Sequence, residues 1–135
     1  MGAAELVHDG IYLVGDASIS HFQDATSFIV QCGEELVMID SGAGKGARAI
    51  EANIRGIPLD PARISLLILT HCHVDHIGSV RYFRDSFGLK VAAHELDADA
   101  VETGDPALTA ASWYGTKLPR VRVDRRLRGE REVLA

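Results

Sequence analysis

The chain has 135 residues, which predicts a single domain large enough to bury its own hydrophobic core. Hydrophobic residues make up 47% of it and charged residues 24%, a composition that argues against a disordered chain. The formal net charge of -5 excludes a nucleic-acid surface built on bulk positive charge. No apolar stretch approaches the ~18 residues that a membrane span needs, so we expect neither nucleic acid nor a membrane as a partner.

Two features of the sequence bear on the compartment in which the protein works. Its only cysteines are Cys32 and Cys72, which are too few for a disulfide framework. Residues 1–10 also lack the basic region and apolar run of a signal peptide. We therefore expect a reduced, cytoplasmic setting.

Short strands and one helix are predicted in the first half of the chain. Apolar runs separated by turn residues indicate three strands, at 11–14, 27–31 and 35–40. Gly33 suits a hairpin turn between the last two strands. Residues 47–56 repeat apolar side chains at spacings of three and four, which predicts an amphipathic helix that Gly56 and Pro58 end.

Helices and strands alternate in the second half. The continuous apolar run at 64–70 indicates a strand that is covered on both faces. Further elements are predicted as a helix at 79–88, a strand at 89–94, a helix at 95–104, loops at 104–119 and a hairpin with a polar turn at 120–135. This order is typical of a single α/β domain, residues 1–135, in which helices cover a mixed sheet.

Three histidines and an aspartate lie within six residues, in the sequence HCHVDH, directly after the apolar run. His71 and His73 are two residues apart, so they point the same way if this segment is extended. Asp75 and His76 follow as the chain turns toward the next helix. Neutral imidazole and carboxylate are suitable ligands for zinc and similar divalent ions. The cluster therefore predicts a metal site beyond a strand end, with a histidine-rich surface loop as the alternative.

The same residues carry a resemblance to a known family. HCHVDH, preceded by LILT and followed by IGS, resembles the HxHxDH signature of the metallo-β-lactamase fold. MIDSG at 38–42 is similar to the earlier motif of that family, an aspartate and a glycine at a strand end. The resemblance covers most of the chain and implies the αββα layers of the family, of which this chain would form the N-terminal half.

The resemblance also implies roles for individual residues. His71 and His73 would bind a first metal ion, and Asp75 and His76 a second, while Asp40 would hold the metal-binding loop by hydrogen bonds. The implied activity is that of a glyoxalase II-like hydrolase. Water activated by one or two zinc ions, or by iron or manganese, would attack an ester, thioester or lactone of a small-molecule substrate. Asp75 would orient this water and accept its proton.

The sequence departs from the family pattern after residue 94. The family completes its sites with a third histidine, a bridging aspartate and a final histidine, whereas no histidine follows His94 here. We therefore expect a chain that is truncated before the later metal-binding motifs and supplies two ligands to each metal. A non-catalytic metal-binding or assembly module is the alternative. Half of the fold would also expose an apolar sheet face, which would favour self-association.

Two further features leave alternatives open. His94 ends a predicted strand, so its ring either bonds to backbone or lines the site as an additional ligand. GAGKGA at 42–47 follows a strand, opens a helix and matches GxGxxA, which together with Asp60 indicates dinucleotide binding weakly. A tight turn after Asp40 explains the same glycines.

Overall fold

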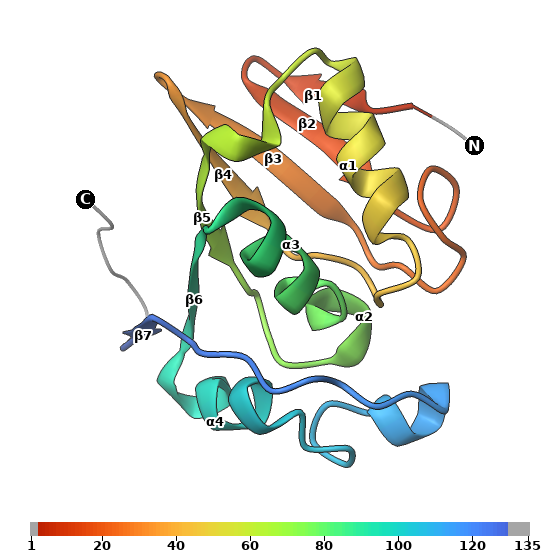
Figure 1. Ribbon diagram of the computed structural model, residues 1–135, viewed down its shortest axis with the longest axis vertical. Coiled ribbons are helices and arrows are strands. Elements are labelled where there is room, and N and C mark those ends of the chain that lie inside the picture. The colour runs from red at the N-terminus through yellow and green to blue at the C-terminus, as the bar shows by residue number, and fades with distance from the viewer. Residues whose placement is uncertain (1–2, 130–135) are drawn as a thin grey trace.

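The computed structural model describes residues 3–129, and in this part of the chain seven strands form one mixed sheet (Figure 1). The strands lie side by side in chain order, as β1 (Glu5–His8), β2 (Ile11–Gly15), β3 (Ser27–Cys32), β4 (Glu35–Ile39), β5 (Ile64–Ile68), β6 (Lys90–His94) and β7 (Arg125–Leu127). Neighbours from β1 to β4 are antiparallel, and neighbours from β4 to β7 are parallel. The predicted α/β fold with a mixed sheet is confirmed.

The helices connect the parallel strands. They are α1 (Ala47–Gly56), α2 (Val74–Ile77), α3 (Val80–Phe87) and α4 (Glu95–Thr103), with short 3-10 helices η1 (Pro61–Arg63) and η2 (Ala111–Tyr114). The predicted helix at 47–56 has the observed bounds of α1. Gly88 ends α3 in the left-handed conformation, as its place after an apolar face predicts.

Three parts of the structure differ from the sequence prediction. Strand β1 was not expected, because its four residues are all exposed and lack a buried face. A separate short helix, α2, begins at Val74, whereas the predicted helix begins only at residue 79, so Asp75 and His76 already lie on a helical turn. In the predicted tail hairpin, only Arg125–Leu127 forms a strand, which pairs in parallel with β6, and residues 130–135 lie outside the described part of the chain.

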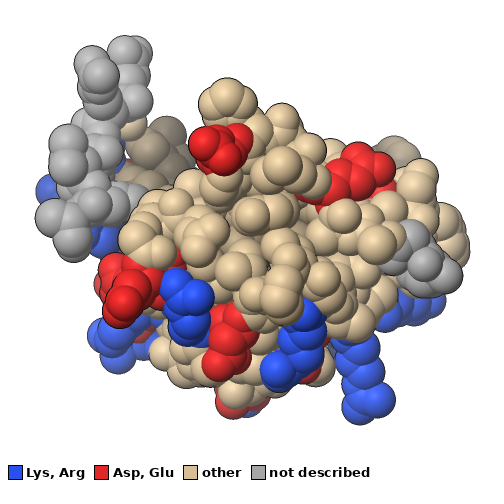
Figure 2. Space-filling model, turned by 90° about the horizontal axis from the view of Figure 1, so that it is seen from above, with Lys and Arg blue, Asp and Glu red and all other residues tan. Residues whose placement is uncertain are grey.

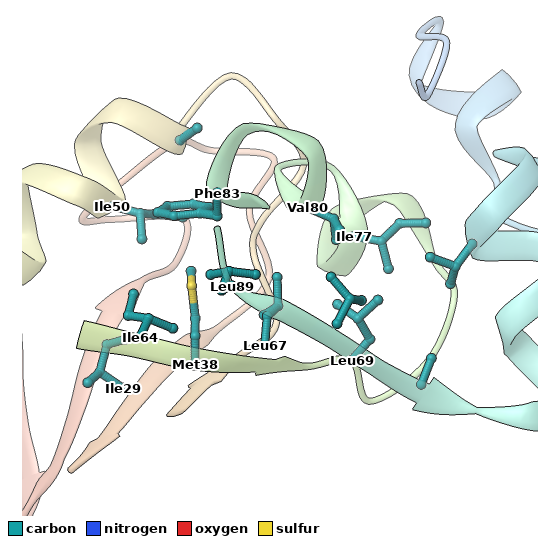
Figure 3. Close-up of a cluster of buried hydrophobic side chains, with 14 of the residues drawn as sticks. Ile29, Met38, Ile50, Ile64, Leu67, Leu69, Ile77, Val80, Phe83 and Leu89 are labelled. Carbon is teal, nitrogen blue, oxygen red and sulfur yellow. The ribbon is translucent and has the colours of Figure 1, made fainter. Parts of the chain in front are cut away.

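The hydrophobic core lies between the sheet and the helices. Every second residue of a strand points toward this side, so Met38 of β4 and Leu67 of β5 are fully buried. Ile50 of α1 and Phe83 of α3 cover them, and Phe83 spreads its ring over the middle of the cluster (Figure 3). This packing holds the ends of β4 and β5, and therefore the loops that follow them, in one position.

All of the helices that contribute to this core lie on the same side of the sheet. The strands β4 to β7 follow one another in one direction, and right-handed crossovers between them place every connecting helix on the same face. Within residues 3–129, no helix lies on the opposite face of the sheet (Figure 1). The prediction that the strand at 64–70 is covered on both faces is therefore wrong, because Leu66 and Ile68 point to this open face and are half-buried.

Charged residues are distributed over the surface with both signs mixed. On the side shown in Figure 2, lysine and arginine side chains alternate with acidic ones along one margin, and the rest of that view is largely uncharged. Among residues 3–129, no helix is long and apolar enough to cross a membrane.

Candidate metal centre

The residues of the HCHVDH motif lie beyond the carboxyl end of β5, next to the end of β4. Asp40 follows β4 directly, and Thr70 is the second residue after β5. Because β4 and β5 are parallel, their carboxyl ends meet at one edge of the sheet. The topology thus brings Asp40 of the earlier motif to the histidine cluster, as the resemblance implied.

Asp40 is the centre of the hydrogen bonds that hold this edge together. Its side chain is buried, and its backbone has a φ of 58°, a left-handed conformation that aspartate tolerates better than most residues. Oδ1 accepts a hydrogen bond from the Thr70 amide at 2.9 Å, and Oδ2 accepts one from Thr70 Oγ1 at 2.6 Å. Oδ2 also lies 2.7 Å from Nδ1 of His76. The carboxylate therefore fixes both the start of the loop and the ring of His76.

These contacts determine which ring nitrogens are left for a ligand. Because the Asp40 carboxylate only accepts, His76 Nδ1 must carry the hydrogen of their bond. Thr70 Oγ1 gives its own hydrogen to Asp40, so at 3.1 Å it accepts from Nδ1 of His71. We infer that both rings carry hydrogen on Nδ1 and expose the lone pair of Nε2, the arrangement typical of a metal-ligating histidine.

The imidazole ring of His71 is in contact with the rings of both His73 and His76. The ring centroid of His71 lies 4.8 Å from that of His73 and 4.1 Å from that of His76. Oδ1 of Asp75 lies 3.8 Å from Nε2 of His76. The structure thus gathers all four residues of the predicted site, with His71 in the middle of the cluster.

The electrostatic surroundings act in opposite directions on two of the rings. Burial lowers the pKa of His71, and the nearby His76 and His73 lower it further. This favours the neutral ring, which is the form that binds a metal ion. The hydrogen bond to Asp40 raises the pKa of His76 despite its partial burial, and the charges of Asp40 and Asp75 add to this effect.

Close backbone contacts lock the loop against the segment after β4. The backbone amide and the hydroxyl of Ser41 both bond to the carbonyl of His76, at 2.7 and 2.9 Å. Gly78 lies so close to this segment that a Cβ atom there would come within 2.0 Å of the carbonyl carbon of Ala43. Glycine is therefore required at position 78 by the backbone packing that places His76.

The donor set fits a metal ion in its chemistry, but the side chains do not form a closed site. Imidazole and carboxylate are ligands of zinc, and two of the rings direct their Nδ1 atoms to hydrogen-bond partners as ligating histidines do. Within residues 3–129, however, no three His, Cys, Asp or Glu side chains are arranged to hold one ion together. The cluster therefore resembles a preassembled part of a metal centre.

The alternatives for His94 and for the glycine-rich segment can be judged from their contacts. His94 Nδ1 accepts a hydrogen bond from Leu96 N at 3.2 Å and so caps α4, which favours the backbone-bonding interpretation. The Asp60 carboxylate similarly caps η1. Gly42 has a φ of 74°, and a Cβ there would lie 2.7 Å from Asp24 Oδ1, so a tight turn accounts for this glycine.

Two residues of the site were not identified from the sequence. Thr70 connects Asp40 to His71, and Ser41 holds the His76 carbonyl. Both stand next to residues that were identified, which was their only signal.

Comparison with known proteins connects this geometry to a family. The family model of the Metallo-beta-lactamase superfamily matches residues 21–133. Among solved structures, the metallo-beta-lactamase GOB-18 from Elizabethkingia meningoseptica aligns with a TM-score of 0.85 at 22% identity, over 99% of this chain and 47% of its own. BJP-1, a subclass B3 metallo-beta-lactamase of Bradyrhizobium japonicum, gives 0.82 at 26% identity over 98% and 48%. MIM-1 from Novosphingobium pentaromativorans gives 0.78 at 28% over 93% and 44%. The chain spans about half the length of these proteins.

Proposed function

The chain belongs to the metallo-beta-lactamase superfamily. From this membership we propose that it functions as a metal-dependent hydrolase. The observation that carries the proposal is the pair of hydrogen bonds that leave Nε2 of His71 and of His76 free. Such bonds to Nδ1 orient an imidazole for a metal ion and fix its tautomer. The match to the superfamily model and the fold shared with solved metallo-beta-lactamases also support metal-dependent hydrolysis.

We propose zinc as the metal, with iron or manganese as substitutes, held by His71, His73, Asp75 and His76. A bound zinc ion would lower the pKa of a water molecule and polarise the carbonyl of the substrate. The residues of the chain have separate tasks. Asp40 holds His76 in place. The Asp75 carboxylate, whose Oδ1 lies 3.8 Å from His76 Nε2, would orient a water molecule and take its proton.

The proposed substrate is a small ester, thioester or lactone. Its carbonyl carbon would be attacked by the oriented water, and the leaving alkoxide or thiolate would take up a proton. The proposed compartment is a reducing one such as the cytoplasm, since Cys32 and Cys72 are both free thiols.

A non-catalytic metal-binding module is the second candidate. It is favoured by the finding that no three ligand side chains within residues 3–129 are arranged to hold one ion. Such a module would bind zinc through the same histidines but would turn over no substrate.

Zinc content and hydrolysis, measured on the same preparation, separate the two candidates. We expect the zinc-loaded chain to hydrolyse a thioester or lactone, and His71→Ala to abolish both zinc binding and turnover. Asp75→Asn should lower the rate by about 10²–10⁴-fold. His8→Ala, on the exposed strand β1, serves as the control. Tight zinc without turnover would favour the binding module, and the absence of both would refute the metal-site proposal for this chain.

A further inference from the structure

His73 differs from the other two histidines of the cluster in how it is held. A ligating histidine is usually oriented by a hydrogen-bond partner on its second ring nitrogen, as Thr70 and Asp40 orient the rings of His71 and His76. His73 is exposed, and among residues 3–129 no group forms a hydrogen bond with its ring. The direction of this ring must therefore come from the backbone on either side of it.

One turn, distant in the chain, holds the backbone on both sides of this ring. It consists of residues 105–111, which follow α4 at the lower edge of Figure 1, and we call it the bracing turn. The Val74 amide donates a hydrogen bond to the carbonyl of Thr109 at 2.7 Å. Sγ of Cys72 donates one to the carbonyl of Leu108 at 3.5 Å. The bracing turn thus contacts the residue before the ring and the residue after it.

The bond to Val74 fixes the peptide unit that joins His73 to Val74. The amide of this unit has no acceptor within α2, because Val74 is the first residue of that helix, and Thr109 supplies one. The carbonyl of the same unit accepts from the amides of His76 and Ile77, at 2.9 and 3.2 Å. A peptide unit is planar, so bonds on both of its sides fix the ψ angle of His73, which is 144°. The direction in which the side chain leaves the backbone follows from this angle.

Two side chains give the bracing turn its shape. Asp105 Oδ1 accepts hydrogen bonds from the amides of Ala107 and Leu108, both at 2.9 Å. Thr109 is fully buried, and its Oγ1 donates to the carbonyl of Asp105 at 2.5 Å and accepts from the amide of Ala111 at 3.2 Å. These bonds set the directions of the two carbonyls that reach the histidine loop.

The backbone of Ala110 shows that the bracing turn is held against a local preference. Its φ is 62°, a left-handed conformation that is unfavourable for a residue with a Cβ atom. Such a conformation persists only where the surrounding contacts determine it. It lies directly after the Thr109 carbonyl, so the chain turns into η2 there while the carbonyl stays bonded to Val74.

We propose that Asp105 and Thr109 are positioning residues for the candidate metal centre. Through the bracing turn they fix the backbone on both sides of His73 and so direct its ring toward the metal ion. The inference rests on the proposed metal site and extends it, because Asp40 and Thr70 hold the other two rings from a different part of the chain.

Two pairs of substitutions in the whole chain test the proposal by zinc titration. Thr109→Val removes the hydroxyl at similar volume and should weaken zinc binding by about tenfold, the lower end of the range for loss of a partner behind a metal ligand. Thr109→Ser keeps the hydroxyl and should retain the affinity. Asp105→Ala should act like Thr109→Val, because two amides lose their acceptor. Asp105→Asn keeps an acceptor oxygen but removes the charge, and it should retain the affinity.

Thr103→Val is the matched control. Oγ1 of Thr103 donates to the carbonyl four residues earlier, that of Asp99, at 2.9 Å, as Thr109 does to Asp105. Thr103, however, is exposed at the end of α4 and has no bond to the histidine loop. Its substitution should leave zinc affinity unchanged.

Nuclear magnetic resonance of the zinc-free protein separates positioning from a general loss of stability. Thr109→Val should speed hydrogen exchange of the Val74 amide and shift the ring signals of His73, while the His76 ring, which Asp40 holds, keeps its signals. A general loss of stability would change both rings together. If circular dichroism shows that Thr109→Val is unfolded, Asp105→Ala provides the same test. These signals need no zinc, so they decide the role of the bracing turn separately from the proposed function.

Three results would overturn the proposal. Unchanged zinc affinity and unchanged His73 signals in both Thr109→Val and Asp105→Ala would show that the bracing turn does not position this ring. Equal losses of affinity in Asp105→Asn and Asp105→Ala would assign the effect to charge rather than to the shape of the turn. A loss in Thr103→Val equal to that in Thr109→Val would make the effect a general one.

Discussion

Replacing Asp40 with asparagine should change the tautomer of His76 while keeping the shape of the site. Asparagine has the same size and also tolerates the left-handed backbone at position 40. One of its side-chain atoms, however, is an amide nitrogen. If its oxygen accepts the Thr70 amide, as Asp40 Oδ1 does, the nitrogen faces Nδ1 of His76. Two donors cannot bond, so the hydrogen of His76 should move to Nε2, which then cannot bind a metal ion.

The size of the effect follows from the bond that is lost. A hydrogen bond to a charged group contributes about 1.5–3 kcal/mol, and loss of a partner behind a metal ligand lowers affinity about 10–100-fold, or ~1.4–2.7 kcal/mol. The two ranges overlap, so we expect Asp40→Asn to weaken zinc binding by this factor. The pKa of His76 should also fall, because the bond to Asp40 is the main cause of its rise.

Nitrogen-15 NMR of the histidine rings reports both the tautomer and the pKa, and a competition titration with a chelator reports zinc affinity. Asp24→Asn is the matched control, because Asp24 is also a buried aspartate but bonds to Ser20 and Ala43. If His76 keeps its hydrogen on Nδ1 and zinc affinity is unchanged in Asp40→Asn, the tautomer argument is wrong.

Three other variants test the framework that holds the site. Arg84 and the amide of Val91 lower the pKa of Asp124 to about 2. The ordinary pKa of an aspartate is 3.8, so the stabilisation from Asp124 should be complete above pH 3.8 and should fade as the pH falls toward 2. At neutral pH, Asp124→Asn should lower the free energy of unfolding by about 2 kcal/mol. Urea unfolding at a series of pH values measures both effects. Gly78→Ala should destabilise the fold by about 1–3 kcal/mol and displace the histidine loop, as measured in thermal melts. Gly56→Ala is the control, because the added methyl group would meet open space, and it should leave stability unchanged or raise it. Phe83→Ala should cost about 3–5 kcal/mol in urea unfolding, because the ring is fully buried, and a cost below 1 kcal/mol would show that the core was assigned wrongly.

The sequence was informative wherever one local pattern determined the structure. The spacing of apolar residues predicted α1 with its observed bounds, and Gly88 predicted the end of α3. The HCHVDH spacing identified all four residues that the structure gathers at the end of β5. Their convergence depends on short-range geometry, which the sequence specifies directly.

The features that the sequence did not predict depend on contacts between segments that are distant in the chain. The open face of β5 could not be predicted from ISLLIL, because a continuous apolar run is equally compatible with a strand covered on one or on both faces. The roles of Thr70 and Ser41 arise only when β4 and β5 pair in parallel. Helix α2 is only four residues long, which is too short to show a helical repeat of apolar residues in the sequence. It is held by contacts with other segments, such as the hydrogen bond from the Val74 amide to the carbonyl of Thr109.

The central claim is that the histidine cluster binds a metal ion through the nitrogens that Asp40 and Thr70 leave free. A zinc titration of the unmodified chain and of the His71→Ala/His76→Ala double variant tests it most directly. We predict saturable zinc binding by the unmodified chain and a loss of at least about 100-fold in affinity in the double variant. Equal zinc affinity in the two proteins would contradict the account.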